Sequence, residues 1–214
     1  IDHTGPMTRT VGDNALMLET LAGPDGVDFR QTDRPSESYE EKLGRDSLKG
    51  IRVGVVAEGF ETPFSEAEVG EQVNFAIDQL RQIGATIVRL SVPMHSKSGL
   101  ITSGTLQASF ASMFFLDGCS IEAMDPVSPA YLEAQRKWRE NPDLLTPNVK
   151  AYMLQSEWMR KRHGYRYVSE SKKRIPVLRS AYDDALKEVD ALVMPTTPMK
   201  ATRLPDSDAS PETI

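Results

Sequence analysis

The 214-residue sequence contains one cysteine, Cys119, so no disulfide can form within the chain. A lone thiol is typical of a reducing compartment and predicts a cytoplasmic location. No run approaches the roughly 20 apolar residues that a membrane-spanning helix needs, so no membrane association is predicted. The three histidines, His3, His95 and His163, are too widely spaced to form a metal-ligand motif, and no metal site is predicted.

Basic residues are outnumbered by acidic ones, 25 to 31, which gives a formal charge of −6. This balance argues against nucleic acid as a main partner, although Arg160, Lys161 and Arg162 form a local basic cluster. Catalytic motifs are also scarce, because the sequence has neither a Gly-x-Ser-x-Gly elbow nor a Walker loop. Ser169 and Lys172 match Ser-x-x-Lys, but that motif needs companion motifs, so a solvated helix face is favoured.

A strand–helix–strand pattern is the clearest unit that the sequence does contain. The β-branched residues of 51–56 predict a strand, and those of 86–90 predict another. Between them, Ser65 and Glu68 match a capping box, and apolar residues recur at helical spacing up to Ile83. Strand, helix and strand at this spacing predict a βαβ crossover with two parallel strands.

Several further elements are predicted from caps, breakers and periodicity. Asp13 can cap a helix that follows it, and Pro176 is expected to kink or break a later helix. Another helix is predicted from four apolar residues at helical spacing, Leu106, Phe110, Met113 and Phe114. The predicted ranges are helices at 14–22, 129–140, from 147 and at 167–189, and a short strand at 192–194. Together these elements indicate an α/β fold, with helices flanking a sheet and a largely helical region after the βαβ unit.

The first twelve residues have neither helical nor strand periodicity and predict a rigid loop. Gly5 permits backbone geometry that a side chain would forbid, and Pro6 fixes the following φ angle. Either a connector into a capped helix or a wall of an active site fits this pattern. The motif residues are Asp2, His3, Thr4, Gly5, Pro6, Met7, Thr8, Arg9, Thr10, Val11 and Asp13.

Four segments in this order, 2–13, 22–28, 49–55 and 190–198, resemble the amidase signature family. The residues of the first segment resemble those of amidases that act after nitrile hydratase. The same is true of Pro198-Met199-Lys200-Ala201. The resemblance implies a mixed sheet flanked by helices and hydrolysis of carbon–nitrogen amide bonds by a Ser–Ser–Lys triad, without a metal or organic cofactor. Spread over nearly the whole chain, four ordered motifs are more specific than any one alone.

No residue of this chain matches the catalytic Lys or either catalytic Ser of the family. We therefore expect an internal segment of an amidase whose nucleophile lies upstream, with no catalytic residue among these 214. Five residues are predicted at the substrate pocket, the first three from the resemblance and the two later threonines from their place in the chain: Ile1, Thr102, Phe110, Thr196 and Thr197. Ile1 would be an apolar wall, and the two threonines follow a strand end, where ligands gather in open α/β sheets.

The expected organisation is a partial amidase signature domain. Residues 1–95 would form the α/β part, 96–189 a mainly helical region that covers the pocket, 190–198 a return strand and loop, and 199–214 an irregular end. The predicted function is hydrolysis of a small-molecule amide to acid and ammonia by the parent protein. The predicted partners are the rest of the amidase chain and, by resemblance, a second copy in a homodimer.

Two other functions remain open from the sequence. The first is that of the A subunit of a tRNA-dependent amidotransferase, which would pass glutamine-derived ammonia to a charged tRNA. The second is that of a non-catalytic binding protein derived from an amidase that has lost its triad.

Overall fold

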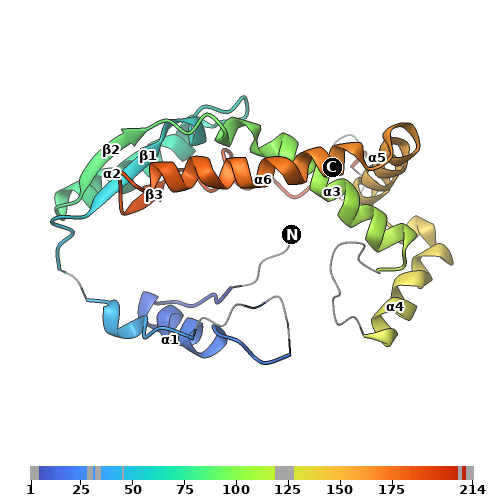
Figure 1. The fold of residues 1–214 in the computed structure, drawn as a ribbon, viewed down its shortest axis with the longest axis horizontal. Helices are drawn as coiled ribbons and strands as arrows, with labels where there is room; N and C mark the ends of the chain where they lie inside the picture. Colours follow the sequence, from blue (N-terminus) through green and yellow to red (C-terminus); the bar gives the residue numbers. More distant parts are fainter. Residues whose placement is uncertain are drawn as a thin grey trace. The chain divides into compact units, whose positions relative to one another are not determined.

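The computed structural model describes residues 5–27, 31, 35–44, 46–118, 128–206 and 209–210. By their contacts, the residues fall into two compact units. The smaller unit comprises residues 1–46 and 124–126, and the larger unit comprises 47–123 and 127–214. All the strands and most of the helices belong to the larger unit (Figure 1).

The described residues form six α-helices and three strands, with short 3₁₀ turns between them. The helices are α1 (Val11–Leu21), α2 (Ala67–Gln82), α3 (Ser98–Phe115), α4 (Pro129–Arg136), α5 (Pro147–His163) and α6 (Arg166–Ala185). The strands are β1 (Arg52–Val56), β2 (Thr86–Leu90) and β3 (Ala191–Val193). The 3₁₀ turns span Glu40–Lys42, Ala57–Gly59, His95–Lys97, Lys137–Arg139 and Pro142–Leu144.

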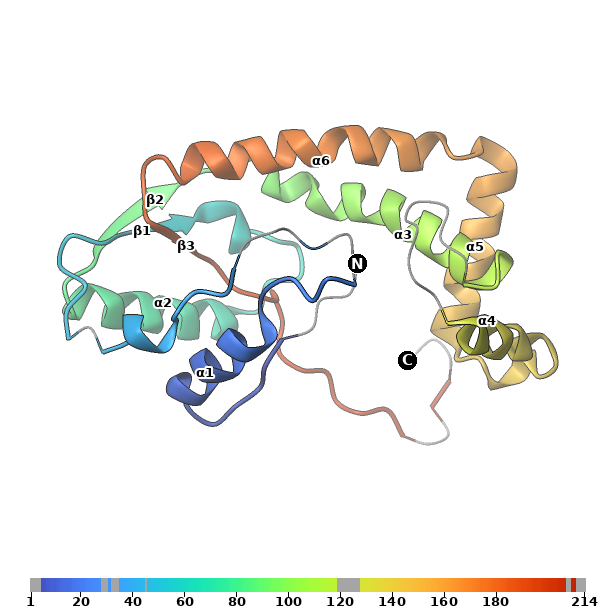
Figure 2. The same cartoon turned by 60° about the horizontal axis from the view of Figure 1, so that its bottom comes forward.

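The sheet of the larger unit has the strand order β2-β1-β3, and both pairings are parallel. The α/β class and the predicted βαβ unit are therefore confirmed. Figure 2 shows the sheet between α6 on one side and α2 on the other. The central strand β1 is buried from Val53 to Val56, as expected for a parallel strand that is covered on both faces.

Gly54 allows the two outer strands to close over the middle of β1. A Cβ atom there would lie 2.6 Å from Leu90 Cδ1 and 3.0 Å from Leu192 Cδ2. The core beside Gly54 contains Val56, Val92 and Ala185. This core joins the end of α6 to the sheet. Burial of these apolar side chains is the main term that holds α6 against the strands.

Asp190 fixes the register of β3, although it lies 138 positions after its partner. Its carboxylate accepts a hydrogen bond from the Arg52 amide at 2.8 Å, and its own amide donates to the Arg52 carbonyl at 2.9 Å. Beyond β3, the Lys200 ammonium pairs with Glu66 and Glu68 at the start of α2. The residues just before β3 are thereby tied to β1, and the chain after β3 is tied to the start of α2.

The first helix begins earlier than the sequence predicted. The structure starts α1 at Val11, and the Thr10 hydroxyl, not Asp13, is the cap, since it accepts from the Asp13 amide at 3.0 Å. Thr10 has extended backbone angles and its side chain reaches the third helical amide, which is the usual geometry of a threonine cap.

The predicted capping box at Ser65 and Glu68 is wrong. Helix α2 starts at Ala67, after Glu66, and no side chain caps it. The Ser65 hydroxyl instead accepts from the Thr62 amide at 3.1 Å, and Glu68 pairs with Lys200. The Glu68 carboxylate, which a capping box would use locally, is instead paired with Lys200, which lies far away in sequence.

Pro176 does not break the last long helix. Helix α6 runs without interruption from Arg166 to Ala185, with Pro176 in its interior and exposed. The predicted face of the 98–115 helix is also partly wrong. Met113 is exposed, and the buried face instead combines Phe114 with Ile101, Gly104, Gln107, Ala108 and Ala111.

Candidate ligand-binding cavity

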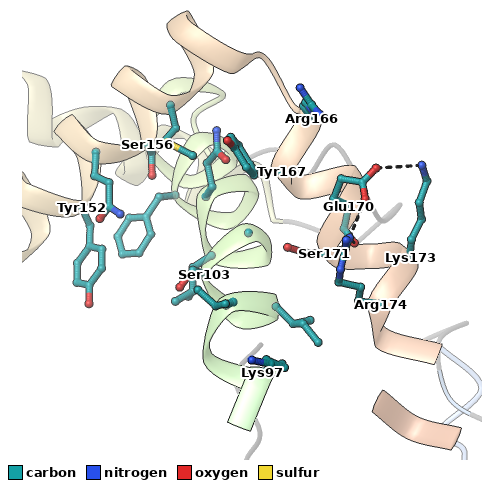
Figure 3. A pocket seen from close by; sticks show the side chains of 18 of the residues that line it. Lys97, Ser103, Tyr152, Ser156, Arg166, Tyr167, Glu170, Ser171, Lys173 and Arg174 are labelled. Atoms are coloured by element: carbon teal, nitrogen blue, oxygen red, sulfur yellow. Dashed lines mark hydrogen bonds and ion pairs between the residues drawn. The ribbon is translucent and has the colours of Figure 1, made fainter. Parts of the chain in front are cut away.

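A cavity of about 1140 Å³ lies between α3, α5 and α6 of the larger unit (Figure 3). Apolar and aromatic side chains line this cavity together with polar and charged ones. Phe110 of α3 stacks on Tyr152 of α5, with ring centroids 5.0 Å apart and planes inclined by 11°. Offset stacking of this kind gives a rigid aromatic surface. The volume of the cavity lies slightly above the roughly 300–1,000 Å³ that is typical of pockets for small organic ligands.

The position of α3 against α6 depends on Gly104. A Cβ atom at Gly104 would overlap Ser171 Oγ and would lie 2.9 Å from the Tyr167 carbonyl oxygen. In Figure 3, Ser171 points from α6 toward α3. The two helices touch where Gly104 meets Ser171, and the cavity opens beside this contact, so the absence of a side chain at Gly104 shapes the cavity.

Gln107 is the most unusual residue of the cavity lining. Its side chain is only 6% exposed, yet neither the amide nitrogen nor the amide oxygen has a hydrogen-bond partner among the described residues. Leaving a buried amide unpaired costs about 1–3 kcal/mol. The sequence analysis missed Gln107. The signal lay in the small residues Gly104, Ala108 and Ala111, whose helical spacing marks a close helix contact with a lone amide inside it.

Glu170, on the α6 side of the cavity, is paired with two neighbouring cations of the same helix. Glu170 accepts hydrogen bonds from Arg174 at 2.7 Å and from Lys173 at 3.3 Å (Figure 3). These bonds hold the pKa of Glu170 below its usual value, the Arg174 bond most strongly. Glu170 is therefore a poor general base, because a lowered pKa makes its carboxylate a weak proton acceptor and two cations engage its oxygens.

The five predicted pocket residues are distributed unevenly. Phe110 lines the cavity, whereas Thr102 lies exposed on α3 and donates to the Ser98 carbonyl at 3.0 Å. Thr196 and Thr197 are exposed in the loop after β3, and Thr197 donates to the Met199 carbonyl at 3.0 Å. Ile1 lies outside the described residues. The structure brings Phe110 to the cavity, and the pocket role of all five stays a prediction.

A second group of polar side chains lies at the carboxyl ends of β1 and β2. Glu58 accepts from the Ser91 hydroxyl at 2.5 Å and from the Val92 amide at 2.8 Å. Burial raises the pKa of Glu58, but the hydrogen bonds from Ser91, Val92 and its own backbone amide, with the nearby His95, together bring the pKa below its usual value. His95 Nδ1 and the Tyr182 hydroxyl share a hydrogen bond of 2.5 Å nearby. Burial, and then the Glu58 charge, raise the pKa of Tyr182.

The described residues contain no group of three or more His, Cys, Asp or Glu side chains that could hold a metal ion. In the same part of the chain, no helix is both long and apolar enough to cross a membrane.

Comparison with known proteins decides the family. The model of the family described as Amidase matches residues 1–213. The chain therefore belongs to the amidase signature family. It is 36% identical over 214 residues to an enantioselective amidase of Rhodococcus rhodochrous, which covers 97% of this chain and 41% of that protein. It is 32% identical over 203 residues to an amidase of Pseudomonas putida, covering 95% of this chain and 38% of that protein.

Other members of the amidase signature family belong to amidotransferases. The A subunit of the glutamyl-tRNA(Gln) amidotransferase of Prochlorococcus marinus is 29% identical over 213 residues, which cover 94% of this chain and 42% of that protein. The chain thus spans about two fifths of the length of the curated relatives it matches.

Solved structures of the amidase signature family share the fold. The A subunit of the Thermotoga maritima glutamyl-tRNA(Gln) amidotransferase superposes with a TM-score of 0.57 at 20% identity, over 96% of this chain and 39% of that one. The peptide amidase PAM, solved with the competitive inhibitor chymostatin, superposes with a TM-score of 0.59 at 23% identity, over 90% of this chain and 40% of that one.

Proposed function

We propose that this chain is part of an amidase that hydrolyses carboxylic amides to acid and ammonia. The nucleophile would be a Ser, activated by the Ser–Ser–Lys triad of the family, on residues outside these 214. Backbone N–H groups would hold the oxyanion, ammonia would leave, and water would release the acid. No metal or organic cofactor is required for this chemistry, and the single thiol suits a cytoplasmic enzyme.

The proposal rests on the sequence identities, which are higher to amidases than to the A subunits of amidotransferases. The chain is 36% and 32% identical to two amidases over nearly its full length, and 28–30% identical to the A subunits of amidotransferases. The amidotransferase function is the second candidate because so many of the relatives carry that name. The overall charge of −6 favours the free-standing amidase, since a surface that meets tRNA is expected to be basic.

The test uses the full-length protein that contains this chain, without any partner protein. We expect it to release ammonia from simple aliphatic or aromatic amides, measured by a coupled glutamate dehydrogenase assay. Ammonia transfer that appears only with a charged tRNA and a second protein would favour the amidotransferase. Absence of both activities would favour a binding protein that has lost its triad.

We further propose that residues 96–189 cover the substrate pocket and that 1–95 with 190–198 form the adjoining α/β part. Thr102, Phe110, Thr196, Thr197 and Ile1 would then tune the size of the acyl group. Substitution of Phe110 by Ala in the full-length protein should raise KM for aromatic amides more than for acetamide, since the aromatic surface shared with Tyr152 is lost. Equal changes in KM for the two amides would contradict a pocket role.

The 214 residues by themselves should be inactive. We expect no amide hydrolysis above the buffer background, because no residue here matches the triad. Turnover by the isolated chain that is lost with Ser169→Ala would overturn this expectation and make Ser169 and Lys172 a working pair. Ser169 lies exposed on α6, one turn after the helix start at Arg166.

A further inference from the structure

We infer that two copies of the protein associate through α5 of one copy and α2 of the other, laid antiparallel. Each copy supplies a basic, partly apolar face on the outside of α5 and an acidic face on the outside of α2, and both helices belong to the larger unit. A two-fold axis forms this contact twice in one dimer, because each copy carries both faces. Association requires no amide hydrolysis, so it can fail while the proposed function stands.

The outward side of α5 carries two large apolar side chains. Ser156 is buried and marks the inward side of the helix. Leu154 and Trp158 lie two residues before and after it, and a step of two residues turns a helix through about 200°. They are 73% and 55% exposed, and four residues apart they are neighbours on the helix surface. Exposed apolar residues at this spacing are typical anchors for a second helix.

Cations continue this face toward the carboxyl end of α5. Lys161 and Arg162 are exposed about one turn after Trp158, and the Arg162 guanidinium lies 5.6 Å from the centre of the Trp158 ring. This cation–π contact orients Arg162. Glu157 is the only acidic residue of α5, and it is already engaged by Arg160 and Lys161. The α5 face is therefore suited to an acidic partner.

The outward side of α2 has the opposite charge. Ile77 is buried and marks the inward side, whereas Phe75, two residues before it, is 61% exposed. Glu71 and Glu68 are exposed one and two turns before Phe75. The α2 face thus combines an aromatic anchor with carboxylates toward the amino end of the helix, and the α5 face combines its anchors with cations toward the carboxyl end.

These charges set the antiparallel orientation. When Phe75 lies between Leu154 and Trp158 of the other copy, an antiparallel α2 places Glu71 beside Lys161. A parallel α2 would instead place Glu71 beside Tyr152, a full turn or more from the exposed cations. The two helices also match in length, with 16 residues in α2 and 17 in α5. Antiparallel neighbours further align the positive end of one helix dipole with the negative end of the other.

Charge disfavours a pair of α5 helices. An antiparallel pair centred on Leu154 and Trp158 would bring Lys161 and Arg162 close to Lys150 of the other copy, and a parallel pair would bring the two basic ends together. Like charges that face each other across an interface oppose association. Helix α2 is the better partner, because it supplies exposed carboxylates beside an exposed aromatic ring.

The test is sedimentation velocity of the full-length protein with reversed charges. One variant combines Lys161→Glu with Arg162→Glu on α5, and the other combines Glu68→Lys with Glu71→Lys on α2. We expect wild type to dimerise at micromolar concentration and each variant to raise the dissociation constant about tenfold or more, since like charges then face each other. An equimolar mixture of the two variants should recover the dimer, because opposite charges meet at both contacts.

The matched control combines Lys172→Glu with Lys173→Glu, which reverses two adjacent exposed cations on α6. Lys173 pairs with Glu170 on its own helix, as Lys161 does with Glu157, so local effects of the reversal are comparable. This control should change the dissociation constant by less than about twofold.

Three results would overturn the inference: a monomeric wild type, a dimer that the α5 variant leaves intact, or a mixture of the two variants that stays monomeric. Coverage of these faces by another segment of the same polypeptide would also overturn it. In that case, the reversed charges would lower the melting temperature and leave the mass of the protein unchanged.

Discussion

At the residue scale, several contacts that hold the larger unit together join residues that are far apart in sequence. Glu58 accepts hydrogen bonds from Ser91 and Val92, and the lack of a side chain at Gly104 leaves room for Ser171. Neither relation has a local pattern in the sequence, since glutamates and glycines are common in turns and helices. Their roles follow from what the fold brings beside them.

Glu58 should make stability depend on pH. Its folded-state pKa lies below the ordinary glutamate value of 4.5, so its contribution is present above that value and is lost as the pH falls through the folded-state pKa. We expect Glu58→Gln to lower the free energy of unfolding by about 1–2 kcal/mol at pH 7, measured by urea titration. The difference from wild type should shrink at pH 3.

The control for Glu58 is Glu133→Gln, at an exposed position on α4. This substitution should change the free energy of unfolding by no more than about 0.5 kcal/mol at either pH. A Glu58→Gln deficit that is equally large at pH 3 and pH 7 would contradict the assignment, because it would then reflect shape and not charge.

Gly104→Ala should destabilise the larger unit, since the new Cβ atom would overlap Ser171 Oγ. We expect a loss of about 1–3 kcal/mol in chemical denaturation, and partial recovery when Ser171→Gly is added. Gly99→Ala on the same helix is the control, because no atom lies within 4 Å of the place its Cβ would occupy and alanine favours helix. Equal stability of the two alanine variants would refute the close contact.

At the element scale, helices α3, α5 and α6 are held together by packing more than by local signals. None of the three has a side-chain N-cap, and α6 contains an interior proline. Pairing with a neighbouring helix compensates for weak caps, because most helix stability in proteins comes from tertiary burial. The sequence could therefore place these helices approximately but not predict that α6 continues through Pro176.

Pro176→Ala should stabilise α6. Pro176 lacks the N–H that would bond to the Lys172 carbonyl, and its exposed ring contributes little packing. We expect the free energy of unfolding to rise by about 1–3 kcal/mol. Thermal denaturation monitored by circular dichroism measures this change. Ser180→Ala, also exposed on α6, should change stability by no more than about 0.5 kcal/mol. A loss of stability with Pro176→Ala would mean that a bend at Pro176 is needed for packing on α3.

At the scale of the whole molecule, much apolar surface of the described residues faces solvent. Leu154 on α5 is 73% exposed, and large apolar side chains on α1, α2 and α6 are also exposed. The sheet has three strands, and β2 and β3 are its edges. Exposed apolar patches and free strand edges are typical of surfaces that another protein segment or a second copy covers.

The 214 residues expressed alone should therefore self-associate. We expect them to bind the dye ANS and to elute in gel filtration with an apparent mass above 23.8 kDa. Leu154→Lys should reduce both effects, whereas Gln155→Lys, which adds the same charge at a neighbouring exposed position, should change them less. A monodisperse 23.8 kDa species without dye binding would show that these surfaces need no cover.

The family, the α/β class, the βαβ unit and the short strand before Pro195 could all be predicted from the sequence. These features depend on near neighbours: β-branched runs, helical periodicity, and four motifs in a fixed order. Only the packed fold shows that Thr10 caps α1, that Glu68 pairs with Lys200, and that the buried Gln107 amide has no hydrogen-bond partner among the described residues. The reason is physical, since hydrogen bonds and close contacts between helices are made with whichever groups the fold brings within about 3–4 Å, at any distance along the chain.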